Sequence, residues 1–149
     1  MNALTRYTPL IGRILLAWIF IRSGYGKIAA FEGAVGYIAS KGVPFPALAA
    51  MGAIVIEIGG GLLLIAGWKT RWAAVAMFLF TALAALIFHS FWAVPADQVM
   101  NQSVHFWKNV AIMGGFLYVF SYGSGPFSVE HVNLGAAGLR GLDDRKAAD

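Results

Sequence analysis

Long apolar stretches alternate with short polar segments along the chain. Four of these stretches, each about 20 residues long, cover residues 9–30, 47–68, 72–92 and 104–122. A helix rises 1.5 Å per residue, so each stretch matches a hydrocarbon core about 30 Å thick. Backbone polar groups inside a bilayer must be paired within the chain, as they are in helices. The pattern therefore predicts an all-α integral membrane protein, a four-helix bundle that crosses the membrane four times.

The connecting segments differ in length and character. Only residues 69–71 separate the second stretch from the third, and such a short connection predicts an antiparallel pair of helices. In the longer segment after the first stretch, Phe31, Val35 and Ile38 recur at helical spacing. This spacing predicts a short amphipathic helix that lies on the membrane interface.

Positive charges predict the orientation. Cytoplasmic loops are enriched in Lys and Arg, and on the other side the loops between spans carry only Lys41. Both termini are therefore expected in the cytoplasm. Residues 1–125 form the expected membrane domain, and residues 126–149, rich in Gly, Ala and mixed charges, are an expected disordered cytoplasmic tail. The cations that set this orientation are Arg6, Lys69, Arg71, Arg140, Arg145 and Lys146.

Composition supports a membrane location. Of the 149 residues, 59% are hydrophobic and only 12% are charged, which is too apolar for an ordinary soluble domain. The chain has no cysteine, which excludes a disulfide, a thiolate nucleophile and a cysteine-ligated iron–sulfur cluster within it. From this composition, the expected partner is the lipid bilayer. The net charge of +4 is not gathered in a basic run, so no nucleic acid is expected as a partner.

Among the polar and charged side chains of the predicted spans, six are the candidates for a shared layer. Glu57 lies near the middle of the second span, where a carboxyl group costs about 2.5 to 3.5 kcal/mol on insertion scales and usually faces a bundle interior. The other five lie roughly 3 to 10 Å from the span centres toward the outer face, at 1.5 Å per residue. Each span thus contributes to one layer, formed by Arg22, Lys27, Glu57, His89, Lys108 and Asn109.

This layer has two interpretations. In the first interpretation, the layer is a buried structural network in which Arg22 or Lys108 neutralises Glu57. Alternatively, it is an outward-facing polar pocket for an anionic or quinone-like ligand, whose oxygen atoms Arg22 and Lys108 would bind. In that pocket Glu57 would orient the ligand or relay a proton, and His89 would titrate. Arg13 lies about 10 Å toward the cytoplasm and is expected to extend to the headgroups.

Histidines raise the question of haem or metal binding. His89 and His105 come from adjacent spans at a similar level, but a bis-histidine haem needs both imidazoles to point inward between apolar helices. Positions near the interface do not predict that geometry, so haem is not expected. The sequence has no His-x-x-x-His or Glu-x-x-His pair, and no metal site is predicted.

Several motifs follow one another along the spans: Ser23-Gly24-Tyr25-Gly26-Lys27, Gly42-Val43-Pro44-Phe45-Pro46, Glu57-Ile58-Gly59-Gly60 and Lys108-Asn109. In this order they resemble the DoxX family of small bacterial four-helix membrane proteins. The resemblance runs from about Ile11 to Glu130 and implies a multi-pass protein of the bacterial plasma (inner) membrane. The family is similar to the small subunit of a thiosulfate:quinone oxidoreductase, which implies a redox partner subunit and a quinone. Its recurrent polar positions fall on Arg13, Lys27, Glu57, Lys108 and Asn109.

Three functions follow as hypotheses. The first is a membrane subunit or anchor of a quinone-linked redox complex, a non-autonomous part of an oxidoreductase. The second is a structural or assembly factor without catalytic activity. The third is a small-solute or proton pathway, which four spans without an evident repeat favour least. Glycine-rich helix faces also leave a homo-oligomer open.

Overall fold

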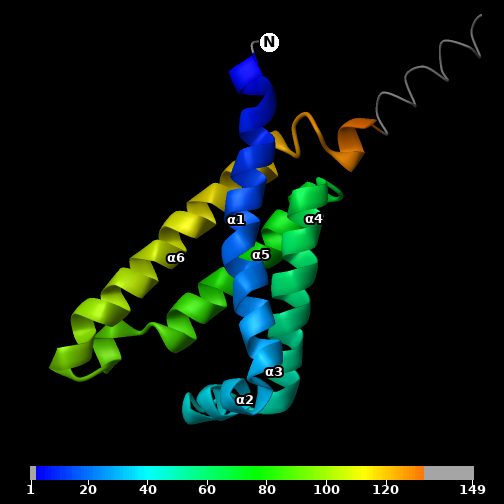
Figure 1. Ribbon diagram of the computed structural model, residues 1–149. Coiled ribbons are helices and arrows are strands. Elements are labelled where there is room, and N and C mark those ends of the chain that lie inside the picture. Colours follow the sequence, from blue (N-terminus) through cyan, green and yellow to red (C-terminus); the bar gives the residue numbers. More distant parts are fainter. Residues whose placement is uncertain (1–2, 133–149) are drawn as a thin grey trace, which may run out of the picture.

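The structure, a computed structural model, describes residues 3–132, and all regular elements in that range are helical (Figure 1). The predicted all-α class is therefore confirmed. A π-helical turn, η1 (Val55–Gly59), continues α3 directly into α4, and a 3-10 turn, η2 (Phe91–Ala93), lies between α5 and α6. The numbered α-helices of the described residues are α1 (Ala3–Ala29), α2 (Phe31–Ser40), α3 (Pro46–Ile54), α4 (Gly60–Ala66), α5 (Thr70–Phe88) and α6 (Ala96–Tyr122), and residues 129–132 are also helical.

Two helical stretches of the described part are long and apolar enough to cross a membrane. They are Pro46–Ala66, which comprises α3, η1 and α4, and Thr70–Ala93. A third span results if α1 and α2, bent by 102° at their junction, count as one. Helix α6 has 27 residues, but polar side chains in its first half keep it below the same hydropathy limit. Four membrane crossings, the bundle they form and the cytoplasmic termini stay predictions.

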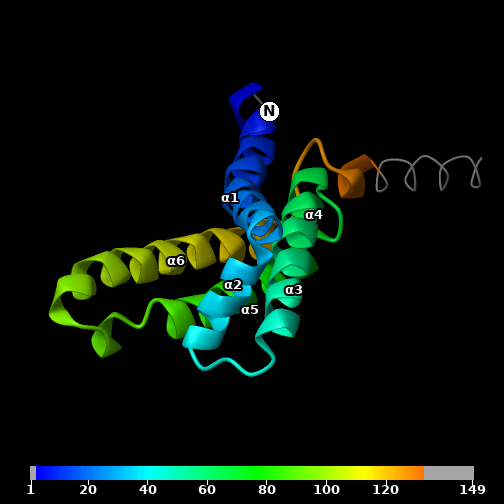
Figure 2. The ribbon, with the colours of Figure 1, turned by 60° about the horizontal axis from the view of Figure 1, so that its bottom comes forward.

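The helices are packed closely at one end and separated at the other. Helix α1 runs beside the continuous α3–η1–α4 rod in the opposite direction, and α5 and α6 form a hairpin that leans away from α1 toward the α2 end (Figure 1). Seen from that end, α2 lies across the opening between these two pairs (Figure 2). It is the short helix predicted after the first apolar stretch. The interior is therefore widest on the side that α2 covers.

The hydrophobic core lies where α1, α4, α5 and α6 converge. Small residues, Ala17 on α1 and Ala73 and Ala74 on α5, let the helix backbones approach, as is usual between helices in lipid. Phe20 and Phe116 join α1 to α6 with ring centroids 5.5 Å apart. Many large apolar residues are instead exposed, which suits a surface that faces lipid. Leu64 and Met77 complete the buried cluster.

Arg13 holds the α4–α5 turn from inside the protein. Its guanidinium is 2% exposed and donates hydrogen bonds to the carbonyls of Leu64 at 3.0 Å, Ile65 at 3.2 Å and Phe127 at 2.8 Å. The first two carbonyls belong to the last turn of α4, where helices have unpaired acceptors and favour a positive charge. Gly67 ends α4 at φ 67°, and a side chain there would overlap Arg13. The predicted extension of Arg13 to the headgroups is therefore wrong.

Residues 123–132 fold back onto the same end of the molecule. The carboxylate of Glu130 accepts hydrogen bonds from the backbone N–H of Thr70 at 3.0 Å and from its hydroxyl at 3.2 Å, and thereby caps the start of α5. Phe127 stacks on Tyr7 near the start of α1, with ring centroids 5.0 Å apart. The first part of the expected disordered tail is thus packed against α1 and α5, whereas residues 133–149 lie outside the described residues.

Candidate functional site

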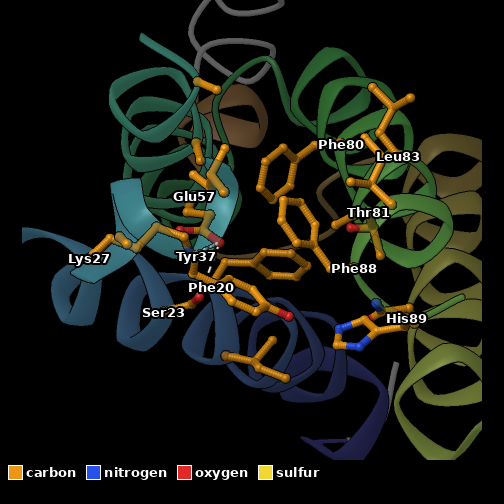
Figure 3. Close-up of a pocket in the computed structure, with 18 of the residues that line it drawn as sticks. Phe20, Ser23, Lys27, Tyr37, Glu57, Phe80, Thr81, Leu83, Phe88 and His89 are labelled. Atoms are coloured by element: carbon orange, nitrogen blue, oxygen red, sulfur yellow. Dashed lines mark hydrogen bonds and ion pairs between the residues drawn. The ribbon is translucent and has the colours of Figure 1, made fainter. Parts of the chain in front are cut away.

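Glu57 lies on the π-helical turn in the middle of the α3–η1–α4 rod. Its side chain is 5% exposed and points into the interior between the helix pairs (Figure 3). A π turn inserts an extra residue into a helix and often marks a functional position. Here it widens the helix at the one residue of the rod that carries a charge.

Lys27 on α1 is the partner of Glu57. Its ammonium nitrogen lies 2.9 Å from both carboxylate oxygens and donates a further hydrogen bond of 2.8 Å to the hydroxyl of Ser23. Ser23 in turn donates to Oε1 of Glu57 at 3.1 Å. Opposite charges at this distance neutralise each other and satisfy the carboxylate without water. Glu57 therefore has Lys27 as its partner, and neither Arg22 nor Lys108 takes the predicted role.

The local sequence explains how Lys27 reaches this depth. Helical side chains lean toward the N-terminus of their helix, so Lys27 extends back over Ser23, four residues earlier. Gly24 then lets α1 approach the rod, because a Cβ atom there would lie 2.7 Å from Cγ1 of Ile58 and 3.3 Å from Cβ of Glu57. The Ser-Gly-x-Gly-Lys motif thus supplies both the donors and the close approach that they need.

A cavity of about 560 Å³ adjoins the ion pair. Its walls come from α1, α2, α3, η1, α5 and α6 and are mostly apolar. Tyr37 of α2 stacks on Phe88 of α5 with ring centroids 5.5 Å apart, which joins α2 to the hairpin beside the cavity. Phe20 and Phe80 add two further rings to the wall (Figure 3). Aromatic walls with a few polar groups are typical of sites for small organic ligands.

A second polar group lines the side of the cavity opposite the ion pair. His89 follows α5, and its Nδ1 lies 2.9 Å from Oε1 of Gln102 on α6. The ring of His89 stacks on that of His105 at 5.0 Å, and Nδ1 of His105 lies 3.1 Å from Nζ of Lys108. Lys108 and Asn109 also line the cavity. Figure 3 shows His89 across the aromatic rings from Glu57 and Lys27.

Five of the six predicted layer residues thus line one cavity, in two groups, and Arg22 does not. Arg22 is exposed on α1, one residue before Ser23, and helical geometry turns it away from the interior. The residues of the layer that do line the cavity are Lys27, Glu57, His89, Lys108 and Asn109.

Histidine pairing does not create a metal centre in the described part of the chain. The rings of His89 and His105 face each other in a stack and do not flank a common axial position. Among residues 3–132, no three His, Cys, Asp or Glu side chains gather closely enough to hold a metal ion.

Ser23 and the aromatic wall were not among the predicted site residues. Ser23 stands four residues before Lys27, a spacing that places the two side chains on one helix face and that the sequence already contains. For Phe20, Tyr37, Phe80 and Phe88, no sequence signal separates a cavity wall from a packed core, since both need apolar residues at helical spacing.

Comparison with known proteins identifies relatives over most of the chain. The DoxX family model matches residues 8–90, which contain Lys27 and Glu57, whereas Lys108 and Asn109 lie beyond the matched segment. The chain is similar to Inner membrane protein YphA of Escherichia coli (strain K12), with 40% identity over 121 residues, which cover 81% of this chain and 86% of that protein.

Two further relatives extend this comparison. Inner membrane protein YqjF of Escherichia coli (strain K12) is 37% identical over 132 residues, 89% of this chain and 96% of that protein. A Surfeit locus protein 4 homolog of Schizosaccharomyces pombe (strain 972 / ATCC 24843) is 26% identical over 83% of this chain, which covers 37% of that longer protein. No solved structure matches the chain significantly.

Proposed function

The chain belongs to the DoxX family and is a protein of the bacterial inner membrane, and from this premise we propose that it is a membrane subunit of a quinone-linked redox complex. In this proposal the cavity beside Glu57 binds the head group of the quinone. The observation that carries it is the combination of a mostly apolar, aromatic wall with a buried ion pair at one side.

The residues of the cavity fit such a head group. A volume of about 560 Å³ is within the range of small-molecule sites, roughly 300 to 1,000 Å³. Flat rings stack well on aromatic side chains, and Phe20, Phe80 and Phe88 lie on the wall. At the ion pair, Glu57 already balances the charge of Lys27, so this side favours an uncharged ligand with oxygen acceptors over an anion.

Each polar residue has a distinct part in this proposal. Lys27 donates a hydrogen bond to one carbonyl oxygen of the ligand by turning toward it one of the two N–H groups that Glu57 accepts, because Ser23 and Glu57 otherwise use all three donors of the ammonium group. Glu57 holds the ammonium group in place and keeps the pair neutral. His89, which lies across the aromatic rings from the ion pair, and Asn109, which also lines the cavity, are proposed to bind a second oxygen of the same ring.

The redox partner is a separate protein in this proposal. A bound quinone supplies reversible acceptance of two electrons and two protons. Because the chain has no cysteine, any thiol chemistry of the complex belongs to the partner. The role of this chain is to bind and orient the head group inside the membrane.

A double substitution tests the proposal without leaving an unpaired charge in the core. Lys27→Met together with Glu57→Gln removes both charges and the ammonium donor, and it keeps side chains of similar size. We expect wild-type protein in lipid nanodiscs to retain decylubiquinone above empty nanodiscs, and the double variant to show a Kd raised about tenfold, the loss of roughly 1.4 kcal/mol. Arg22→Met, which removes an exposed arginine from the same helix, is the matched control and should bind normally.

The same experiment tests a second candidate, an assembly factor without a ligand. That candidate is favoured by the complete pairing of Glu57 with Lys27 and Ser23. It predicts that wild-type protein binds no more quinone than empty nanodiscs do, while each single charge substitution lowers the melting temperature and the double variant recovers part of the loss. Absence of binding by folded wild-type protein would reject the quinone proposal.

A further inference from the structure

At α5 the wall of the cavity reaches the outer, apolar surface of the protein, where two of its residues are exposed. Leu83 and Ile87 on α5 both line the cavity, and their side chains are 58% and 37% exposed. They stand four residues apart and so share one face of the helix. These two residues therefore border both the cavity and the outer surface of the protein.

This part of the wall lies at the depth of the hydrocarbon core. Leu83 is near the middle of the membrane-crossing stretch Thr70–Ala93, about 20 Å from its first residue at 1.5 Å per residue. The surface beside it is apolar, with Leu79 and Leu86 also exposed on α5. An opening at this depth meets acyl chains and no bulk water.

The polar anchor of the cavity lies at a similar depth. Glu57 is near the middle of Pro46–Ala66, about 15 Å from either end of that rod. A phospholipid cannot bring its charged headgroup to this depth without leaving the interface, at a cost of several kcal/mol. A small uncharged ring with oxygen acceptors can reach it, and an apolar chain attached to the ring can stay in the bilayer.

We propose that the ligand is a lipid-soluble amphiphile whose head group binds beside Lys27 and Glu57 while its long apolar chain leaves the cavity past Leu83 and Ile87 into the bilayer. This inference rests on the proposed function and specifies how the ligand enters. An enclosed site would admit only a head group with a short chain. The lateral opening admits a chain of any length, because the chain exchanges one apolar environment for another.

Binding of ubiquinone analogues of different chain length tests this route. The series consists of a head group without a side chain, a decyl analogue and a full polyisoprenoid analogue, each measured in nanodiscs as mole fraction in the lipid. Wild-type protein should bind the long-chain analogues within about threefold of the head group. Leu83→Trp, which fills the opening with an indole, should weaken the polyisoprenoid analogue at least tenfold more than it weakens the head group. Leu15→Trp, at an exposed leucine on α1 outside the cavity wall, should change neither.

The outcomes separate the two proposals. Binding of the head group without binding of the long-chain analogues would overturn the lateral route and leave the proposed function standing, as would equal binding by Leu83→Trp and wild-type protein. Failure of all analogues to bind would reject the proposed function itself. If Leu83→Trp does not fold, wild-type protein supplies the test: a photoreactive group partway along the chain should label the α5 segment that contains Leu83 and Ile87, and labelling elsewhere would overturn the route.

Discussion

Glu57 and Lys27 form a charge pair in the middle of an apolar structure, and the residues around them make it stable. Both carboxylate oxygens accept hydrogen bonds of 2.9 Å from the ammonium group of Lys27, and one of them also accepts a hydrogen bond from the hydroxyl of Ser23. Removing one partner of such a buried pair typically costs about 3 to 5 kcal/mol, because the other charge stays unpaired. Gly24 is what allows the two helices to bring these groups together.

Substitution of Gly24 by alanine tests this close approach. The added methyl group would lie 2.7 Å from Cγ1 of Ile58, and overpacking of this kind costs about 1 to 3 kcal/mol. We expect Gly24→Ala to lower the melting temperature in detergent by several degrees. Gly26→Ala is the matched control, since Gly26 has open space around it and alanine favours a helix by up to about 1 kcal/mol. A Gly24→Ala protein as stable as Gly26→Ala would show that α1 does not need this contact.

The sequence predicts the depth of Glu57 but not its partner. Depth follows from the hydropathy pattern alone, because an apolar stretch of fixed length has a defined centre. The choice among Arg22, Lys27 and Lys108 depends on which way each side chain points around its helix. Arg22 is nearer to the span centre than Lys27, yet it is exposed, and Lys27 leans back along α1 to reach the carboxylate.

Two of the elements around the site are irregular, and both irregularities lie close to the residues of the ion pair. The π turn at η1 lies at Glu57, and the bend of 102° between α1 and α2 follows closely after Lys27. The π turn has no signature in a single sequence, since apolar residues continue through it, and at the junction of α1 and α2 the sequence predicts a new helix but not the angle of the bend. At the other end, Arg13, Gly67 and residues 123–132 tie α1, α4 and α5 together. These helices are therefore held together at the α4–α5 turn and diverge near α2.

Substitution of Arg13 tests whether its hydrogen bonds hold these helices together. Arg13→Met would leave the carbonyls of Leu64, Ile65 and Phe127 without their donor in a buried place. We expect a loss of about 2 to 4 kcal/mol, since each unsatisfied group costs roughly 1 to 3 kcal/mol and part of the cost relaxes. Thermal unfolding in detergent measures it, with Arg22→Met as the exposed control on the same helix. A melting temperature equal to that of the control would contradict the structural role of Arg13.

The described part of the molecule consists of two helix pairs that are joined at one end and diverge at the other (Figures 1 and 2). Residues of both pairs line the cavity. Hydropathy locates two long helical stretches within a few residues: the predicted stretch 47–68 compares with Pro46–Ala66, and the stretch 72–92 with Thr70–Ala93. The other two helices begin earlier than the predicted stretches 9–30 and 104–122, at Ala3 and Ala96. Hydropathy does not reveal how the pairs diverge, because lipid-facing and cavity-facing residues are equally apolar. For the same reason the sequence gives no sign that Phe80 and Leu83 on α5 border the cavity.

The central claim is that this cavity holds a small molecule in the membrane. Native mass spectrometry of protein released directly from bacterial membranes tests it, with Ala84→Phe to fill the cavity and Ala76→Phe as control. Ala84 lines the cavity and Ala76 is exposed elsewhere on the same helix. We predict that wild-type protein and Ala76→Phe retain a bound species of the mass of a membrane quinone and that Ala84→Phe does not. A wild-type protein without any bound small molecule, or equal retention by Ala84→Phe, would contradict the account.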